Sequence, residues 1–178
     1  MDKRIIFIGL IVAQIAIPCQ LVISTEQILK HGTPYKFKTA PVDPYDIFRG
    51  RYVSLASDQR SVDVKNGEKF FKGQDVYLIL ENDEDGFARI VEARYEKPSG
   101  LDYIKGTARY QHGKELIFDS KLSRYYMNEK KAPKAEKLYR ENSRVGKRNA
   151  FILVKVLNGK PLIEDLYVDD KPISSFLD

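Results

Sequence analysis

Several stretches of this sequence hold residues whose types and spacing could do chemistry, and ENDEDGFARIVE, residues 81–92, is the first. Aligned on its glycine, it places Glu81, Asp83 and Asp85 at positions 1, 3 and 5 of a calcium-binding loop. Glu92 falls at position 12. However, position 1 is Glu, and the flanking residues predict strands where the calcium motif needs helices. We therefore expect a solvated hairpin turn and no metal, with an ion-binding loop as the alternative.

Histidine and cysteine, the residues that most often bind zinc or act as nucleophiles, are scarce. His31 and His112 lie beside glycines in predicted turns, without zinc-binding spacing. Cys19 is the only cysteine and lies in an N-terminal apolar run, so the rest of the chain can form no disulfide. An unusual Ser-Lys hydrolase is a weaker alternative, since the serine–methionine pair of signal peptidases is absent. We expect no catalytic residues, no cofactor and no enzymatic activity.

A strongly basic segment spans residues 129–148, with eight Lys or Arg against three Glu. Its net charge of +5 equals that of the whole chain, which has 30 basic and 25 acidic residues. Such a run is typical of a solvated face. Alternatively it contacts anionic membrane headgroups, each basic residue contributing about 1 kcal/mol. The residues that would make these contacts are Lys130, Lys131, Lys134, Lys137 and Arg140.

A third stretch, TAPVDPYDIFRGRYVSL (residues 39–55), holds two prolines and two aspartates between two predicted strands. Each proline fixes its own φ and pushes the preceding residue toward an extended conformation. Asp43 and Asp46 can accept backbone N–H bonds in turns. Phe48 and Tyr52 supply apolar bulk. The pattern predicts a rigid corner between strands, partly buried, with a structural role.

The N-terminus determines where these residues lie. Residues 5–25 carry no charge and would span roughly 31 Å as a helix, about the thickness of a bilayer core. We expect a retained transmembrane signal-anchor. A cleaved signal peptide and a lipid anchor on Cys19 are the alternatives, disfavoured by the lack of a small-residue cleavage site and by Pro18 before the cysteine.

The charges that flank this run predict its orientation. Lys3 and Arg4 precede it, and basic flanking residues mark the cytoplasmic side. We therefore expect a single-pass membrane protein whose C-terminal domain lies outside the cytoplasm, in a periplasm or the extracellular space. Nucleic acid is not expected as a partner of such a domain. The expected parts are a cytoplasmic N-terminus (1–4), the anchor (5–25), a linker (26–34) and a β-rich domain (35–178).

The remaining patterns predict strands. Residues 35–38 alternate between apolar and basic, and residues 76–80 form a continuous apolar run, as in a central strand. Asn158-Gly159 between two apolar runs predicts a hairpin. In residues 87–95 we expect one shared face, formed by Phe87, Arg89, Val91, Ala93 and Tyr95.

We expect a mainly β (α+β) fold, a sandwich or small barrel with one or two short helices. One of these helices begins near Pro133, with a stripe formed by Ala135, Leu138, Asn142 and Val145. The segments 76–98 and 151–172 resemble each other, so either a duplication or two similar hairpins accounts for them.

Nine residues of the corner resemble the signature of the GDYXXLXY family: Pro41, Asp43, Pro44, Asp46, Phe48, Arg49, Gly50, Tyr52 and Leu55. That family consists of bacterial membrane-anchored proteins with no assigned reaction, so the resemblance implies the bacterial cytoplasmic (inner) membrane. Two positions depart from the motif, Arg51 in place of Asp and Ser57 in place of the final Tyr. The resemblance implies an extracytoplasmic interaction module that acts with another membrane or envelope protein, such as a multi-pass one. A ligand- or ion-binding domain is the alternative.

Overall fold

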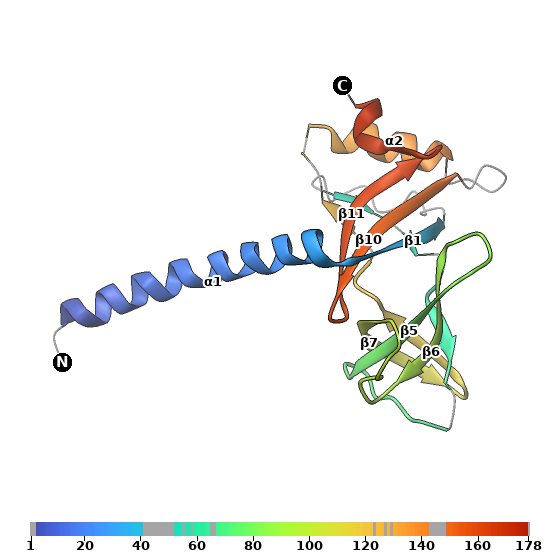
Figure 1. The fold of residues 1–178 in the computed structure, drawn as a ribbon, viewed down its shortest axis with the longest axis horizontal. Coiled ribbons are helices and arrows are strands. Elements are labelled where there is room, and N and C mark those ends of the chain that lie inside the picture. Colours follow the sequence, from blue (N-terminus) through green and yellow to red (C-terminus); the bar gives the residue numbers. More distant parts are fainter. Residues whose placement is uncertain are drawn as a thin grey trace.

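The computed structural model describes residues 3–40, 52–54, 56–57, 59–64, 67–122, 124–126, 128, 130–142 and 149–177. A long N-terminal helix leads into a β-rich domain with two lobes, which lie above and below the end of the helix in Figure 1. The predicted fold class is confirmed, because strands dominate the domain and its own helices are short.

The first helix, α1 (Lys3–His31), continues through Pro18. Its segment Gly9–His31 is long and apolar enough to cross a membrane. Strand β1 (Thr33–Ala40) begins after the single residue Gly32, so the segment 26–34 comprises the last helical turns and the start of this strand. Large apolar side chains along α1 are exposed: Phe7, Leu10, Ile11, Val12, Ile15, Ile17, Leu21, Val22 and Ile23.

The upper lobe is built on a five-stranded antiparallel sheet with the order β12-β11-β10-β1-β3. Tyr35 and Phe37 of β1 are buried and the lysines beside them are exposed, as the alternation predicted. The predicted hairpin joins β10 and β11, and Asn158 and Gly159 have φ of 53° and 75°, as a type I′ turn requires. The other strands are β12 (Lys171–Pro172), β11 (Lys160–Val168), β10 (Ala150–Leu157) and β3 (Ala56–Ser57).

Two short helices cover this lobe, α2 (Ala132–Asn142) and the 3-10 helix η1 (Ile173–Phe176) (Figure 1). Beside them, β2 (Tyr52–Ser54) pairs with β9 (Arg124–Tyr126). The helix predicted near Pro133 is confirmed, and Ala135 from its predicted stripe is buried. Tyr139, which the stripe omitted, is the larger buried side chain of α2. Val145 lies outside the described residues.

The lower lobe is a second five-stranded antiparallel sheet with the order β4-β8-β7-β5-β6. Its two edge strands also contact each other, and Gln59 links them: its Nε2 donates to the carbonyl of Ile90, and its Oε1 accepts the Ile90 N–H at 2.8 Å. The Gln59 side chain thus makes the hydrogen bonds to Ile90 that a neighbouring strand would make. It joins the two edges, so the sheet approaches a small closed barrel. The strands are β4 (Ser61–Asp63), β8 (Glu115–Asp119), β7 (Tyr103–His112), β5 (Asp75–Asn82) and β6 (Ala88–Arg94).

The predicted face of β6 is wrong. Ala88 and Ile90 are buried, whereas Arg89 is exposed. The register between β5 and β6 shifts at Val91, which has no partner, because Glu92 pairs with Ile79 and Ile90 with Leu80. Such a β-bulge moves the following residues to the opposite face, which a strict period of two cannot anticipate.

The two lobes share one hydrophobic core. Next to that core, Lys36 of β1 forms a parallel bridge with Phe87, which precedes β6. On the other side of β1, the Lys105 N–H of β7 donates to the carbonyl of Gly159 at 2.7 Å. The β10–β11 hairpin and β1 therefore tie the upper sheet to the barrel.

Candidate functional site

Most of the predicted corner lies outside the described residues, namely Pro41, Asp43, Pro44, Asp46, Phe48, Arg49, Gly50 and Leu55, together with Arg51. The backbone of Tyr52 is described: it lies in β2 and pairs with Tyr126 of β9. The structural role of the corner stays a prediction.

The basic segment lies on and before α2. Lys130 precedes the helix, and Lys134 and Lys137 lie on its exposed side, opposite the buried Ala135. Lys131 is half-buried, and the backbone of Arg140 belongs to the last turns of the helix. The solvated face predicted for this segment agrees with the exposure of these lysines, and contact with headgroups stays a prediction.

The stretch 81–92 forms a hairpin between β5 and β6, and both of its flanks are strands, as predicted. Asp83 uses both carboxylate oxygens: Oδ1 accepts the N–H groups of Asp85 and Phe87 at 3.1 and 2.8 Å, and Oδ2 accepts Lys38 Nζ at 3.1 Å. The Phe87 N–H above all, and then Lys38, lower the pKa of Asp83. Its carboxylate therefore fastens this turn to β1.

Within the described part of the chain, no group of three or more His, Cys, Asp or Glu is arranged to hold a metal. Glu92, the twelfth residue of the calcium pattern, does not turn toward Asp83. Its Oε1 and Oε2 instead accept Arg94 Nε and Nη2 at 2.9 and 3.1 Å. The hairpin thus separates the carboxylates that the calcium pattern would have brought together.

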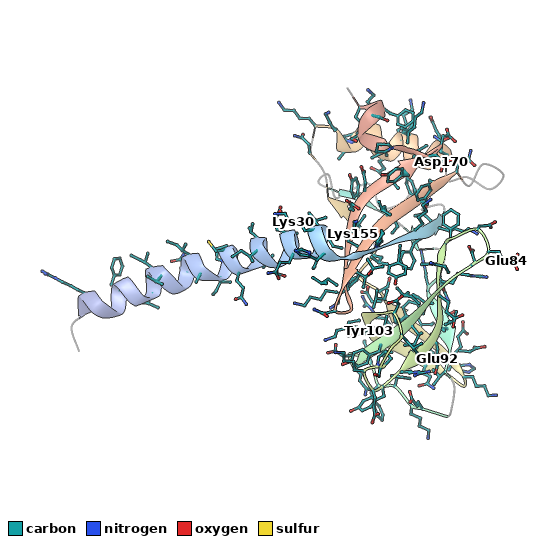
Figure 2. The ribbon with its side chains drawn as sticks, viewed as in Figure 1. Lys30, Glu84, Glu92, Tyr103, Lys155 and Asp170 are labelled. Atoms are coloured by element: carbon teal, nitrogen blue, oxygen red, sulfur yellow. The ribbon has the colours of Figure 1, made fainter. Side chains whose placement is uncertain are left out.

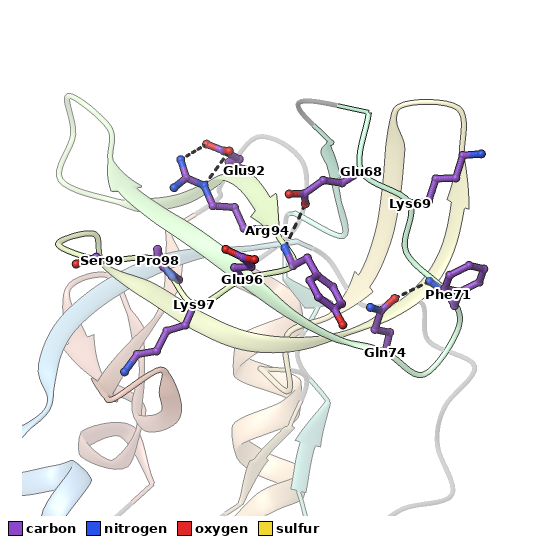
Figure 3. A pocket seen from close by; sticks show the side chains of 11 residues that line it. Glu68, Lys69, Phe71, Gln74, Glu92, Arg94, Glu96, Lys97, Pro98 and Ser99 are labelled. Atoms are coloured by element: carbon purple, nitrogen blue, oxygen red, sulfur yellow. Dashed lines mark hydrogen bonds and ion pairs between the residues drawn. The ribbon is translucent and has the colours of Figure 1, made fainter.

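A cleft of about 770 Å³ lies on the side of the barrel, between the segment before β5 and the end of β6 (Figure 3). Two aromatic side chains in it are exposed, Phe71 by 74% and Tyr95 by 58%. Phe70, by contrast, is buried in the core. The other residues that line the cleft are Glu68, Lys69, Gln74, Glu92, Arg94, Glu96, Lys97, Pro98 and Ser99.

Ion pairs and hydrogen bonds hold the cleft in shape. The bidentate bond to Glu92, which is only 8% exposed, fixes the Arg94 guanidinium and raises its pKa. The carboxylate of Glu68 accepts the Tyr95 N–H at 3.1 Å (Figure 3). The cleft thus offers aromatic faces, a fixed guanidinium and carboxylates to a ligand that has both apolar and polar parts.

The sequence did not predict this cleft, because Glu92 was considered only as part of a solvated hairpin turn or, alternatively, of an ion-binding loop. One signal was present in the pair Phe70-Phe71. Neighbouring side chains in an extended segment point to opposite sides, so a single sheet face cannot bury both rings. One exposed phenylalanine was therefore to be expected beside the core.

Comparison with known proteins identifies a family for this chain. The family model described as GDYXXLXY protein matches residues 14–166, which include most of α1, the lower lobe and most of the upper lobe. No curated protein and no solved structure matches the chain. The matched region covers most of the sequence, including the corner whose residues resemble the family signature. The chain belongs to the GDYXXLXY family.

Proposed function

We propose that this protein is a membrane-anchored, non-enzymatic interaction module that acts outside the cytoplasm with another membrane or envelope protein. One observation carries the proposal: α1 exposes apolar side chains along its length, and it enters β1 after one residue. Exposed apolar surface of this extent marks a membrane or protein interaction site. A domain held this way stays close to the membrane, where its partners are concentrated.

The test is cross-linking in intact cells that produce the full-length chain, followed by purification in a mild detergent. We expect a discrete complex that contains an integral membrane protein. The complex should persist when residues 5–25 are replaced by an unrelated apolar span, because the domain carries the recognition. It should be largely lost when a cleavable signal peptide replaces α1, because anchoring raises the effective concentration. A chain that stays monomeric in the native membrane would contradict the proposal.

The cleft of Figure 3 favours a second candidate, a domain that binds a small ligand outside the cytoplasm. Its exposed Phe71 and Tyr95 rings and the fixed Arg94 support this candidate. Native mass spectrometry of the purified full-length chain should then reveal a retained small molecule. Phe71→Ala with Tyr95→Ala should release it, whereas Tyr110→Ala should not, since that exposed ring lies outside the cleft. Unchanged retention in the double variant would exclude this site.

A further inference from the structure

The end of α1 is fixed to the domain. Gly32 N–H donates to the Ile28 carbonyl at 2.8 Å, and the Ile28 side chain is buried. A Cβ on Gly32 would collide with that carbonyl and lie 3.0 Å from Lys155 Cβ, so the junction has no room for a side chain. The last turns of α1 also contact β10 and β11. The domain therefore has a fixed orientation relative to α1. If α1 crosses a membrane, the same face of the domain is always directed toward that membrane.

Five lysines lie near the end of α1, and we name them the collar: Lys30, Lys97, Lys105, Lys155 and Lys160. Figure 2 shows the first and fourth beside the end of α1.

Contacts within the domain connect the other three lysines to this end. Lys97 lines a cleft of about 540 Å³ together with Thr33, the first residue of β1. Gly159 lines the same cleft and accepts the Lys105 N–H at 2.7 Å. Lys160 follows Gly159 in the chain. Thr33 lies two residues beyond α1, no more than about 7 Å of extended chain, so the cleft opens next to the helix end.

The collar carries uncompensated positive charge. Lys30 pairs with Glu26 at 3.5 Å and Lys155 with Glu164 at 3.8 Å. The other three lysines form no ion pair with any residue that the structure describes. All three side chains are exposed, and the Lys105 ammonium lies 5.8 Å from the centre of the Tyr77 ring, which leaves its charge unneutralised. The three positive charges are thus available to a negatively charged surface.

Exposed acidic residues lie at the opposite end of the domain. Figure 2 shows Glu84 and Asp170 on the side away from α1. Both lie in exposed turns beside further carboxylates, Asp85 and Asp169. Lysines without a described ion pair therefore lie next to the helix end, where the cleft also contains Asp102. Exposed carboxylates lie at the far side, where Lys38 pairs with Asp83 and Asp85.

We propose that the collar rests on the anionic phosphate groups of phospholipids in the leaflet from which the domain emerges. This rests on the proposed function, in which α1 crosses the membrane. Positive charge beside the helix end and negative charge away from it complement such a surface. The domain then stands in one orientation, with its acidic turns directed outward.

The expected strength follows from the free lysines. Each basic residue near an anionic surface favours contact about fivefold, so three favour it roughly 100-fold. Reversing all three charges should therefore convert a domain that stays on the surface into one that leaves it.

The chain has no tryptophan, so a single introduced one is a unique fluorescent probe. Full-length Ser99→Trp and Glu84→Trp would be placed in nanodiscs that contain lipids with a quencher in the headgroup. Ser99 is exposed and lines the cleft beside α1, whereas Glu84 lies at the acidic end. In discs rich in phosphatidylglycerol, we expect strong quenching in Ser99→Trp and little in Glu84→Trp. In discs of phosphatidylcholine alone, quenching in Ser99→Trp should fall.

The charge test adds Lys97→Glu, Lys105→Glu and Lys160→Glu to Ser99→Trp, and we expect quenching to be lost. The matched control reverses three exposed lysines outside the collar, Lys72, Lys114 and Lys171, and should keep it. Equal unfolding curves would show that both triple variants fold. Three results would overturn the proposal: no quenching in Ser99→Trp, equal quenching in both lipids, or unchanged quenching after collar reversal. None of these assays requires a protein partner, so their outcome is independent of the cross-linking test.

Discussion

At the scale of single residues, Asp83 matches a calcium ligand in the sequence pattern, but its carboxylate instead holds the β5–β6 turn against β1 through hydrogen bonds. Its folded-state pKa is lowered, first by the Phe87 N–H and then by Lys38. A lowered pKa contributes stability above the unfolded pKa of about 3.9, and this is lost as the pH falls through the folded value. We expect Asp83→Asn to remove part of the acid sensitivity of unfolding, measured as denaturant midpoints between pH 2 and 7.

The same geometry predicts the response to calcium. Both Asp83 oxygens are occupied by hydrogen bonds, and Glu92 is held by Arg94. Millimolar calcium should therefore leave the Tm unchanged, in the wild type and in Asp83→Asn alike. A rise of several degrees in the wild type that the variant abolishes would contradict this assignment of Asp83.

Tyr125 contributes stability with a pH dependence opposite to that of Asp83. Its hydroxyl donates to Asp165 Oδ1 at 2.8 Å, and partial burial, followed by Asp165, raises the pKa of its phenol. A raised pKa gives stability that is complete below the unfolded value of about 10, and this is lost as the pH rises through the folded value.

We expect Tyr125→Phe to lower the free energy of unfolding at pH 7 by about 1 kcal/mol, because the ring stays and the hydrogen bond is removed. The wild type should lose this advantage at strongly alkaline pH, so the two unfolding curves should converge there. Tyr110→Phe, at an exposed ring, is the control and should have no effect. Equal stabilities of wild type and Tyr125→Phe at pH 7 would show that the bond contributes nothing.

At the scale of elements, Gly32 is the junction on which the position of the domain depends. In Gly32→Ala the new methyl group would meet the Ile28 carbonyl, Lys155 Cβ and the Val156 nitrogen, none of which is the end of a pliable side chain. Overpacking of this kind costs about 1–3 kcal/mol. Gly9→Ala, within α1, has open space and should be neutral or slightly stabilising. Unfolding of the full-length chain in nanodiscs measures both, and equal curves for the two variants would contradict a rigid junction.

The elements also show what the sequence could predict. Local signals were sufficient for the alternation of Tyr35 and Phe37, the apolar run of β5 and the Asn158-Gly159 turn, since each depends on neighbouring residues. The face of β6 was wrong because a bulge at Val91 depends on its partner strand. The Gln59 bridge and the cleft of Figure 3 join segments distant in sequence, and no periodicity encodes such pairings.

At the scale of the whole molecule, one core joins two lobes, and the edge strands of their two sheets are covered in different ways. Gln59 closes the barrel, whereas β11 pairs with β12 over only two residues, Tyr167 and Val168. Pro161, which has no N–H to donate, lies in the remaining part of β11, and such residues protect an edge against pairing with other chains. Pro161 therefore limits pairing of β11 with other chains. In the proposed function, the contacts of the domain depend on how α1 orients it.

The charges that flank the apolar run of α1 predict on which side of the membrane the domain lies. Lys3 and Arg4 flank the apolar run on its short side, and short basic flanks stay in the cytoplasm. Protease added to intact spheroplasts should therefore degrade the domain from Gly32 onward, while a cytoplasmic marker protein stays intact. Lys3→Glu with Arg4→Glu removes the orienting charge and should leave part of the chain protected, whereas Lys130→Glu with Lys134→Glu, far from the run, should not. Full protection of the wild-type domain, with degradation only after lysis, would place it in the cytoplasm and remove the basis for an extracytoplasmic partner.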